Sequence, residues 1–447
     1  MASAAEQLAA NLNFGAFAKA TELKKRLWFT LGALIVYRLG TYIPLPGIDP
    51  VVLQDIFRQQ SGGILGMFNM FAGGALERMT IFALNIMPYI SASIILQLMT
   101  SVSPTLGALK KEGETGRKKI NQYTRYLTVL IAVLQAYGVA VGIEGMTSSS
   151  GPAVGDPGWF FRFTAVVSLV GGTVFLMWLG EQSTARGVGN GISLIIFAGI
   201  VAGLPTALAG TLELGRTGAL SSAFIALLLL GSVAVVYGIV FVERAQRRII
   251  VQYPKRQVGN KMFGGESSHL PLKINTSGVI PLIFASSILL TPVTVISITA
   301  GQDTTGIMAE IAAWLGRGSP SYLLIYGALI AFFAFFYTAV VFNPVETADN
   351  LKKYGGFVPG IRPGKNTADY LDYVLTRLTV LGAVYLVAVA ILPEILISRY
   401  AVPFFFGGTS LLIVVSVTLD TVAQIQSHLL AHQYEGLIKK SRLKGRR

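Results

Sequence analysis

Ten apolar stretches, each about 18 residues or longer, dominate this sequence. Because a helix rises about 1.5 Å per residue, about 20 such residues cross the roughly 30 Å hydrocarbon core of a bilayer. The chain of 447 residues is 53% hydrophobic and only 13% charged, unlike a soluble protein of this length. We therefore predict an all-α polytopic membrane protein. Its ten expected spans are 27–43, 79–100, 126–143, 161–180, 192–209, 219–242, 276–298, 321–343, 378–397 and 402–424.

The first apolar stretch follows Lys24, Lys25 and Arg26, as the core of a signal peptide would, but no small-residue cleavage site follows it. We therefore expect it to remain as the first span. The sequence contains no cysteine, which excludes disulfides, thiolate metal sites and a cysteine nucleophile.

The positive charges are distributed unevenly between the two sides of these spans. Of the 36 Lys and Arg residues, 29 lie in the two tails and in alternate loops, whereas the remaining loops hold five. The positive-inside rule places the charge-rich side, and with it both termini, in the cytoplasm. We divide the chain into a cytoplasmic N-terminal tail (1–26), a first half (27–209), a second half (219–424) and a basic cytoplasmic C-terminal tail (425–447).

Five spans fall on each side of the 209–218 loop, so related halves would be inverted repeats. The sequence itself shows no convincing repeat. Two long loops in the second half, 243–275 and 344–377, are basic and rich in Gly and Pro. Two interpretations stay open for them: topogenic charge on solvated loops, or docking of a large acidic or anionic cytosolic partner.

The segment 61–75, SGGILGMFNMFAGGA, lies outside the first span yet is apolar and bracketed by glycine pairs. It could be an interfacial helix on the outer leaflet. The glycines would also let it move as a unit. This freedom to move as a unit favours a re-entrant plug over an interfacial helix.

Charged residues are scarce within the expected spans. Arg38 is the clear mid-membrane charge, while Arg162, Glu394 and Asp420 lie near span ends, where they can reach the interface. Ion-coupled transporters need titrating or coordinating groups along their pathway. A pore without such groups can still close, because an apolar constriction expels water. An ion-coupled secondary solute transporter therefore remains the less favoured alternative to a polypeptide channel.

Enzyme activity is poorly supported. His269, His428 and His432 all lie outside the spans, so no span offers a histidine as a catalytic base. The spacing of His428 and His432 could hold a metal ion on one helix face, but the sequence shows no third ligand for it. The stretch GVGNGIS (187–193) leads into an apolar span rather than following a strand, which argues against nucleotide binding. No P-loop is present. We predict no catalytic site, no metal and no cofactor.

Several sequence strings, in order along most of the chain, resemble those of the SecY family of bacterial protein-translocation channels. They are highly specific together, although each alone would be weak. They are YRLGTYIPLPGID (37–49), MFNMFAGGA (67–75), IMPYISASIILQL (86–98), GEQSTARGVGNGISLIIFAGIVAGLP (180–205), SHLPLKIN (268–275), GVIPLIFASSILL (278–290), FNPVETADNLKK (342–353), FVPGIRPG (357–364) and FFGGTSLLIVV (405–415).

The resemblance implies two pseudo-symmetric inverted halves of five helices that form a clamshell around an hourglass pore, with a plug and a lateral gate. It also implies a pore ring of isoleucines. The matching positions are Ile86, Ile90, Ile192, Ile196, Ile283 and Ile413. Spacing of four residues places each of the first two pairs on one helix face. Ordinary helix packing would explain any single isoleucine, but six matches favour the ring.

The resemblance maps the plug to 62–75 and the lateral gate to the contact of spans two and three with spans seven and eight. Polar gate positions are Gln97, Gln135 and Asn275, and such polar pairs are worth only about 1 kcal/mol in membranes. The plug residues are Gly62, Gly63, Ile64, Leu65, Gly66, Met67, Phe68, Asn69, Met70, Phe71, Ala72, Gly73, Gly74 and Ala75.

By the same resemblance, the partners are the membrane subunits SecE and SecG, the SecA ATPase, the ribosome with its RNA, secretory and membrane-protein nascent chains, and the bilayer of the bacterial plasma (inner) membrane. The docking residues are Arg247, Arg248, Lys255, Arg256 and Arg362. Asn260 and Lys261 stand where many bacterial relatives carry more arginine, which leaves the strength of ribosome contact open. The implied function is to pass unfolded secretory chains across the membrane and to release transmembrane segments sideways into lipid.

Overall fold

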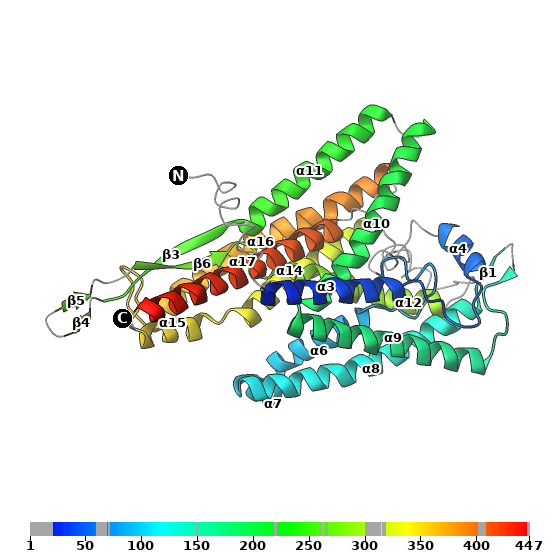
Figure 1. The fold of residues 1–447 in the computed structure, drawn as a ribbon. Helices are drawn as coiled ribbons and strands as arrows, with labels where there is room; N and C mark the ends of the chain where they lie inside the picture. The colour runs from blue at the N-terminus through cyan, green and yellow to red at the C-terminus, as the bar shows by residue number, and fades with distance from the viewer. Residues whose placement is uncertain are drawn as a thin grey trace.

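Long helices make up most of the computed structural model, running side by side (Figure 1). A hairpin of β3 (Gln246–Gln252) and β6 (Ser267–Lys273) lies at one end, which we call the hairpin end. Helix α4 (Pro50–Gln59) and β1 (Thr147–Ser148) lie at the opposite end. The described residues are 21–59, 72–148, 151–218, 221–254, 256–258, 261–263, 267–299, 319–400 and 408–444, with Asn69 and Trp314.

The first half of the chain forms a group of mutually packed helices. Helix α8 contacts α6 and α9, and α9 also contacts α3 and α10. At the opposite end, β1 pairs with β2 (Gly151–Pro152), and α4 packs against β1. The remaining helices of this half are α3 (Thr21–Gly40), α6 (Met87–Val102), α7 (Pro104–Lys111), α8 (Glu114–Glu144), α9 (Trp159–Arg186) and α10 (Gly191–Arg216).

The second half forms another packed group. Helix α14 contacts α12 and α16, and α17 contacts α11 and α16. The two halves meet where α12 contacts α6 and α8, and where α10 contacts α11 and α17. One buried apolar cluster extends through both halves. The helices of this half are α11 (Ser222–Arg244), α12 (Ile280–Thr299), α14 (Pro320–Val341), α15 (Pro344–Lys353), α16 (Lys365–Tyr400) and α17 (Gly408–Lys444).

The two long basic loops fold together at the hairpin end. Strands β3 and β6 pair antiparallel from Gln246 opposite Lys273 to Gln252 opposite Ser267. Further out, β4 (Arg256–Val258) pairs with β5 (Lys261–Phe263). The backbone of Gln252 exchanges hydrogen bonds with that of Phe357, at N–O distances of 2.9 and 3.0 Å. A small core of its own joins the hairpin to the second loop and to α16; its buried residues are Ile249, Leu272, Val358, Leu371, Val374 and Leu378.

Each of the ten expected spans coincides with one helix in the described residues, but the helices differ in character. Seven are long and apolar enough to cross a membrane, or eight if α6 and α7, bent by 98°, count as one span. Two others are less clear-cut. Helix α3 begins among Lys24, Lys25 and Arg26, and the described apolar part of α12 is the short stretch Ile280–Leu289.

The expected second span, 79–100, begins later as a helix than the sequence predicts. Residues 72–79 and 81–86 form successive turns, with positive φ angles of 43° at Met79 and 48° at Asn85, and α6 starts only at Met87. Proline suits this start because the first helical residues need no backbone N–H partner, and Pro88 occupies the first turn. Hydropathy could not find this boundary, since the turn residues are themselves apolar and buried.

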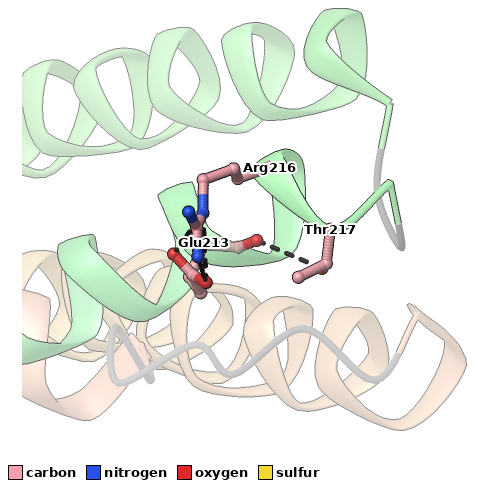
Figure 2. Close-up of polar contacts among 3 residues, drawn as sticks. All are labelled: Glu213, Arg216 and Thr217. Carbon is pink, nitrogen blue, oxygen red and sulfur yellow. Dashed lines mark hydrogen bonds and ion pairs between the residues drawn. The ribbon is translucent and has the colours of Figure 1, made fainter.

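The connection between the halves is shorter than expected. Helix α10 continues to Arg216, past the predicted end at 209, and Ser221 caps α11 by accepting a hydrogen bond from the backbone of Phe224. Figure 2 shows the last turn of α10, where Arg216 donates two hydrogen bonds to the Glu213 carboxylate. The distance from Nε to Oε2 is 3.0 Å, and the distance from Nη2 to Oε1 is 2.6 Å. Thr217 donates its hydroxyl to the Glu213 carbonyl at 3.1 Å. These contacts close the helix before the chain turns into the second half.

Candidate functional site

Four of the six predicted ring isoleucines surround one small cavity between the halves. Ile86 comes from the turn before α6 and Ile90 from the start of α6, whereas Ile196 comes from α10 and Ile283 from α12. The cavity measures about 10 Å³, roughly the space of a single water molecule. Met87, Asn85 and Ser286 complete its wall, which is mostly apolar. This is the geometry of a narrow, mostly apolar constriction.

A second, larger cavity of about 310 Å³ opens toward the hairpin end. Ile196 and Ile283 line it as well, and Ile413 of α17 joins them there. The rest of its wall includes polar and charged side chains, among them Glu243, Lys273 and Asp420. The isoleucines therefore separate a polar chamber from the small apolar cavity.

Ile192 occupies a different position from the other five. It lines neither cavity, and its side chain packs against α9. A Cβ added at Gly180 would lie 2.9 Å from its Cγ1. In this closed arrangement Ile192 contributes to helix packing between α9 and α10, one turn closer to the hairpin end than Ile196.

Five plug residues are described; residues 62–68, 70 and 71 lie outside the described residues. Of the five, Ala72 and Ala75 are buried. Gly73 has a positive φ of 65° and lies so close to α10 that an added Cβ would be 2.9 Å from the Gly199 Cα. The last part of the plug segment therefore needs glycine at this point.

Arg38 reaches the same segment from α3. Its Nη1 donates a hydrogen bond of 2.9 Å to the Gly73 carbonyl, and the neighbouring Tyr37 hydroxyl donates one of 3.4 Å to the Ala72 carbonyl. The guanidinium also lies 5.4 Å from the centre of the Tyr42 ring. The single mid-span arginine thus binds a backbone carbonyl of the plug segment, and it lines neither of the two cavities described above.

The predicted gate positions lie on elements that meet, without forming one hydrogen-bonded set among the described contacts. Gln97 of α6 donates to the Ser93 hydroxyl at 3.4 Å, and Gln135 is half-buried on α8. Asn275 precedes α12 and is only 3% exposed. Its amide binds within the second half, with its shortest hydrogen bond, 2.7 Å, to the Glu243 carboxylate.

The predicted docking arginines lie at the hairpin end. Arg247 and Arg248 are exposed on β3, and Arg362 is exposed in the loop before α16. The hairpin and that loop pack together, so all three arginines lie at the same end of the molecule, although the strand neighbours Arg247 and Arg248 project from opposite faces of the hairpin. Arg256 begins β4, and Lys255 lies outside the described residues.

Sequence reasoning missed Glu243, which lines the larger cavity and holds Asn275. One signal was present: an acidic residue in the last turn of an apolar helix is disfavoured by the helix dipole and so needs another reason to be there. The described residues contain no group of three or more His, Cys, Asp or Glu side chains that could hold a metal ion.

The chain is similar to known translocation channels along nearly its whole length. A family model described as SecY matches residues 80–422. "Protein translocase subunit SecY" of Rickettsia conorii is 56% identical over 423 residues, 95% of this chain and 97% of the relative. The same-named protein of Escherichia coli K12 is 57% identical over 426 residues, covering 95% and 96%.

Solved structures share the fold. One titled as a protein conducting channel superposes with a TM-score of 0.67 at 18% identity, covering 92% of this chain and 93% of that one. Sec61 in a canine ribosome–channel complex from the endoplasmic reticulum gives 0.64 at 18% identity, with the same coverage. The predicted fold class, an all-α multi-span channel fold, is confirmed.

Proposed function

This chain belongs to the SecY family of protein translocase subunits, and from that membership we propose how it works as a protein-conducting channel. Unfolded secretory polypeptides pass between its halves through the isoleucine constriction, and apolar segments leave sideways into lipid between the pair α6 and α8 and the pair α12 and α14. The observation that carries this proposal is the constriction itself, an apolar collar between a polar chamber and a cavity no larger than about one water.

An apolar collar suits a polypeptide conduit for two physical reasons. Isoleucine side chains exclude water and therefore ions when no substrate is present. They also contact passing side chains of every kind by dispersion forces, which are individually weak and undirected. A collar of polar or charged groups would bind particular segments and would stay hydrated.

The hairpin end faces the cytoplasm in this proposal, with both termini on that side of a bacterial plasma membrane. The positive-inside distribution of Lys and Arg supports this orientation. The larger cavity is then the entrance for the polypeptide. The proposal gives this chain no enzyme activity, so a partner, either SecA or a translating ribosome, drives the polypeptide through the channel. SecE and SecG are the other membrane subunits in this proposal.

The test uses the absence of native cysteine. A single cysteine is introduced as Ile283→Cys, and a secretory chain that carries its own cysteine is stalled in transit. The control is Leu230→Cys, on a side chain of α11 that is 71% exposed and lines neither cavity. We expect disulfide crosslinking of the stalled chain at Ile283→Cys and little at the control.

Equal crosslinking at both positions, or none in membranes that do translocate the chain, would contradict passage through this constriction. Saturable uptake of a small solute by the purified protein would instead favour the transporter alternative.

The exposed arginines at the hairpin end predict a second result. Replacing Arg247, Arg248 and Arg362 together by Glu is expected to weaken docking of ribosomes or SecA by about tenfold or more at low salt, because charge steering operates over a Debye length. The matched control is Arg216→Glu, at the opposite end of the molecule. Sedimentation of the partner with membranes measures the affinity, and raising the salt concentration should shrink the difference. Equal losses in both variants would count against docking at these arginines.

A further inference from the structure

The base of the β3–β6 hairpin is joined directly to the turn that begins α12. The backbone N–H of Ile274 donates to the Ala245 carbonyl at 3.1 Å, which extends the ladder one step beyond Gln246 and Lys273. Just beyond this step, the side chains of Glu243 and Asn275 meet. The end of α11, the hairpin and the start of α12 thus form one continuous hydrogen-bonded unit.

Asn275 builds the turn that leads into α12. Its Oδ1 accepts from the Ser277 hydroxyl at 3.0 Å and from the Gly278 backbone at 3.1 Å. Its Nδ2 donates to the Gly278 carbonyl at 3.1 Å, and Gly278 has a positive φ of 63°. The amide therefore fixes a turn that glycine alone would leave free to take other conformations.

Glu243 fixes the orientation of that amide. Its Oε1 accepts from the Asn275 Nδ2 at 2.7 Å, the short distance of a bond to a charged acceptor. Asn275 is 3% exposed, so water competes poorly for the donor. The Tyr385 hydroxyl of α16 lies near the carboxylate. Backbone packing reinforces the arrangement, because a Cβ at Gly382 of α16 would lie 2.9 Å from the Ile274 carbonyl oxygen.

We infer that Glu243 is a positioning residue that ties the turn before α12 to the hairpin base, so that a partner docked on the hairpin moves α12 against α6 and α8. The inference deepens the proposed function, on which it rests. It names the contact through which a cytoplasmic docking event reaches the gate.

The experiment measures coupling between docking and gate separation. Ile90 and Ser286 line the same small cavity from α6 and α12. In the Ile90→Cys/Ser286→Cys protein, the rate of crosslinking by a short bis-maleimide reports how closely the two helices approach. Ribosomes carrying a stalled signal-sequence chain are added, and their binding is measured in parallel. In the parent we expect docking to lower the crosslinking rate about fivefold.

Glu243→Ala is expected to bind the ribosomes normally while its crosslinking rate no longer responds to them. Glu243→Gln keeps an oxygen acceptor for Asn275 and should retain the response. The matched control is Glu213→Ala, which removes another glutamate from the last turn of a helix, at the opposite end (Figure 2). A response in Glu243→Ala equal to that of the parent would overturn the inference, as would an equal loss in Glu213→Ala.

A pair of substitutions that exchanges the carboxylate and the amide between positions 243 and 275 distinguishes loss of this contact from misfolding. Asn275→Asp alone sets one carboxylate against another and should abolish the response. Adding Glu243→Gln places an amide donor opposite the new carboxylate and should restore it at least in part; no restoration would contradict the inference. A parent channel that never crosslinks its stalled chain at Ile283→Cys would instead contradict the proposed function, so the two failures are distinguishable.

Discussion

Membranes that contain the Ile283→Asn variant are expected to leak ions at least about tenfold faster than membranes that contain the parent protein. An amide introduced into the mostly apolar collar draws in water, because a buried amide that lacks a hydrogen bond costs about 2 kcal/mol or more and hydration relieves that cost. Water admitted at the constriction lowers the barrier to ions, and each 1.36 kcal/mol removed from a barrier raises the rate about tenfold. Ile283 is the appropriate position because it lines both cavities.

The measurement is ion efflux from vesicles that contain purified protein and no translocating chain. Leu230→Asn is the matched control, since it adds the same amide on an exposed face of α11. An unchanged leak in Ile283→Asn would mean that the ion barrier lies elsewhere in the pore. An increase in both variants would point to general disruption of the fold.

Gly172→Val is expected to destabilise the first half strongly. A Cβ at Gly172 would overlap the backbone carbonyl of Ile81, in the turn that replaces the expected start of the second span. A backbone atom cannot rotate away as a side chain can, so α9 must shift from the turn. Overpacking of this kind costs about 1–3 kcal/mol, and we expect the upper part of that range.

The adjacent glycine supplies the control. Gly171 lies on the same helix, but a Cβ added there would meet no atom within 4 Å. Gly171→Val therefore carries the same change in helix propensity without the clash. In detergent, the temperature of unfolding should fall by several degrees for Gly172→Val and much less for Gly171→Val. Equal values would show that the approach of α9 to Ile81 is not tight in the folded protein.

The candidate site was predictable in part. Sequence strings located all six isoleucines, and five of them line a cavity in the structure. Ile192 could not be told apart from the others, because spacing along a helix gives the face of a residue but not its depth relative to neighbouring helices. Glu243 was missed because its partner, Asn275, is distant in sequence and meets it only once the hairpin has formed.

The sequence by itself determined that the chain is a multi-span helical protein and which of its loops are basic. Both are local properties: hydrocarbon thickness sets the length of an apolar helix, and the excess of Lys and Arg needs only to be counted along the chain. Tertiary structure decided the rest. Contacts between distant residues produced three features: the turn before α6, the pairing of the two basic loops through Gln252 and Phe357, and the hydrogen bond between Glu243 and Asn275. Such contacts are fixed by packing in three dimensions, which no local pattern of residues encodes.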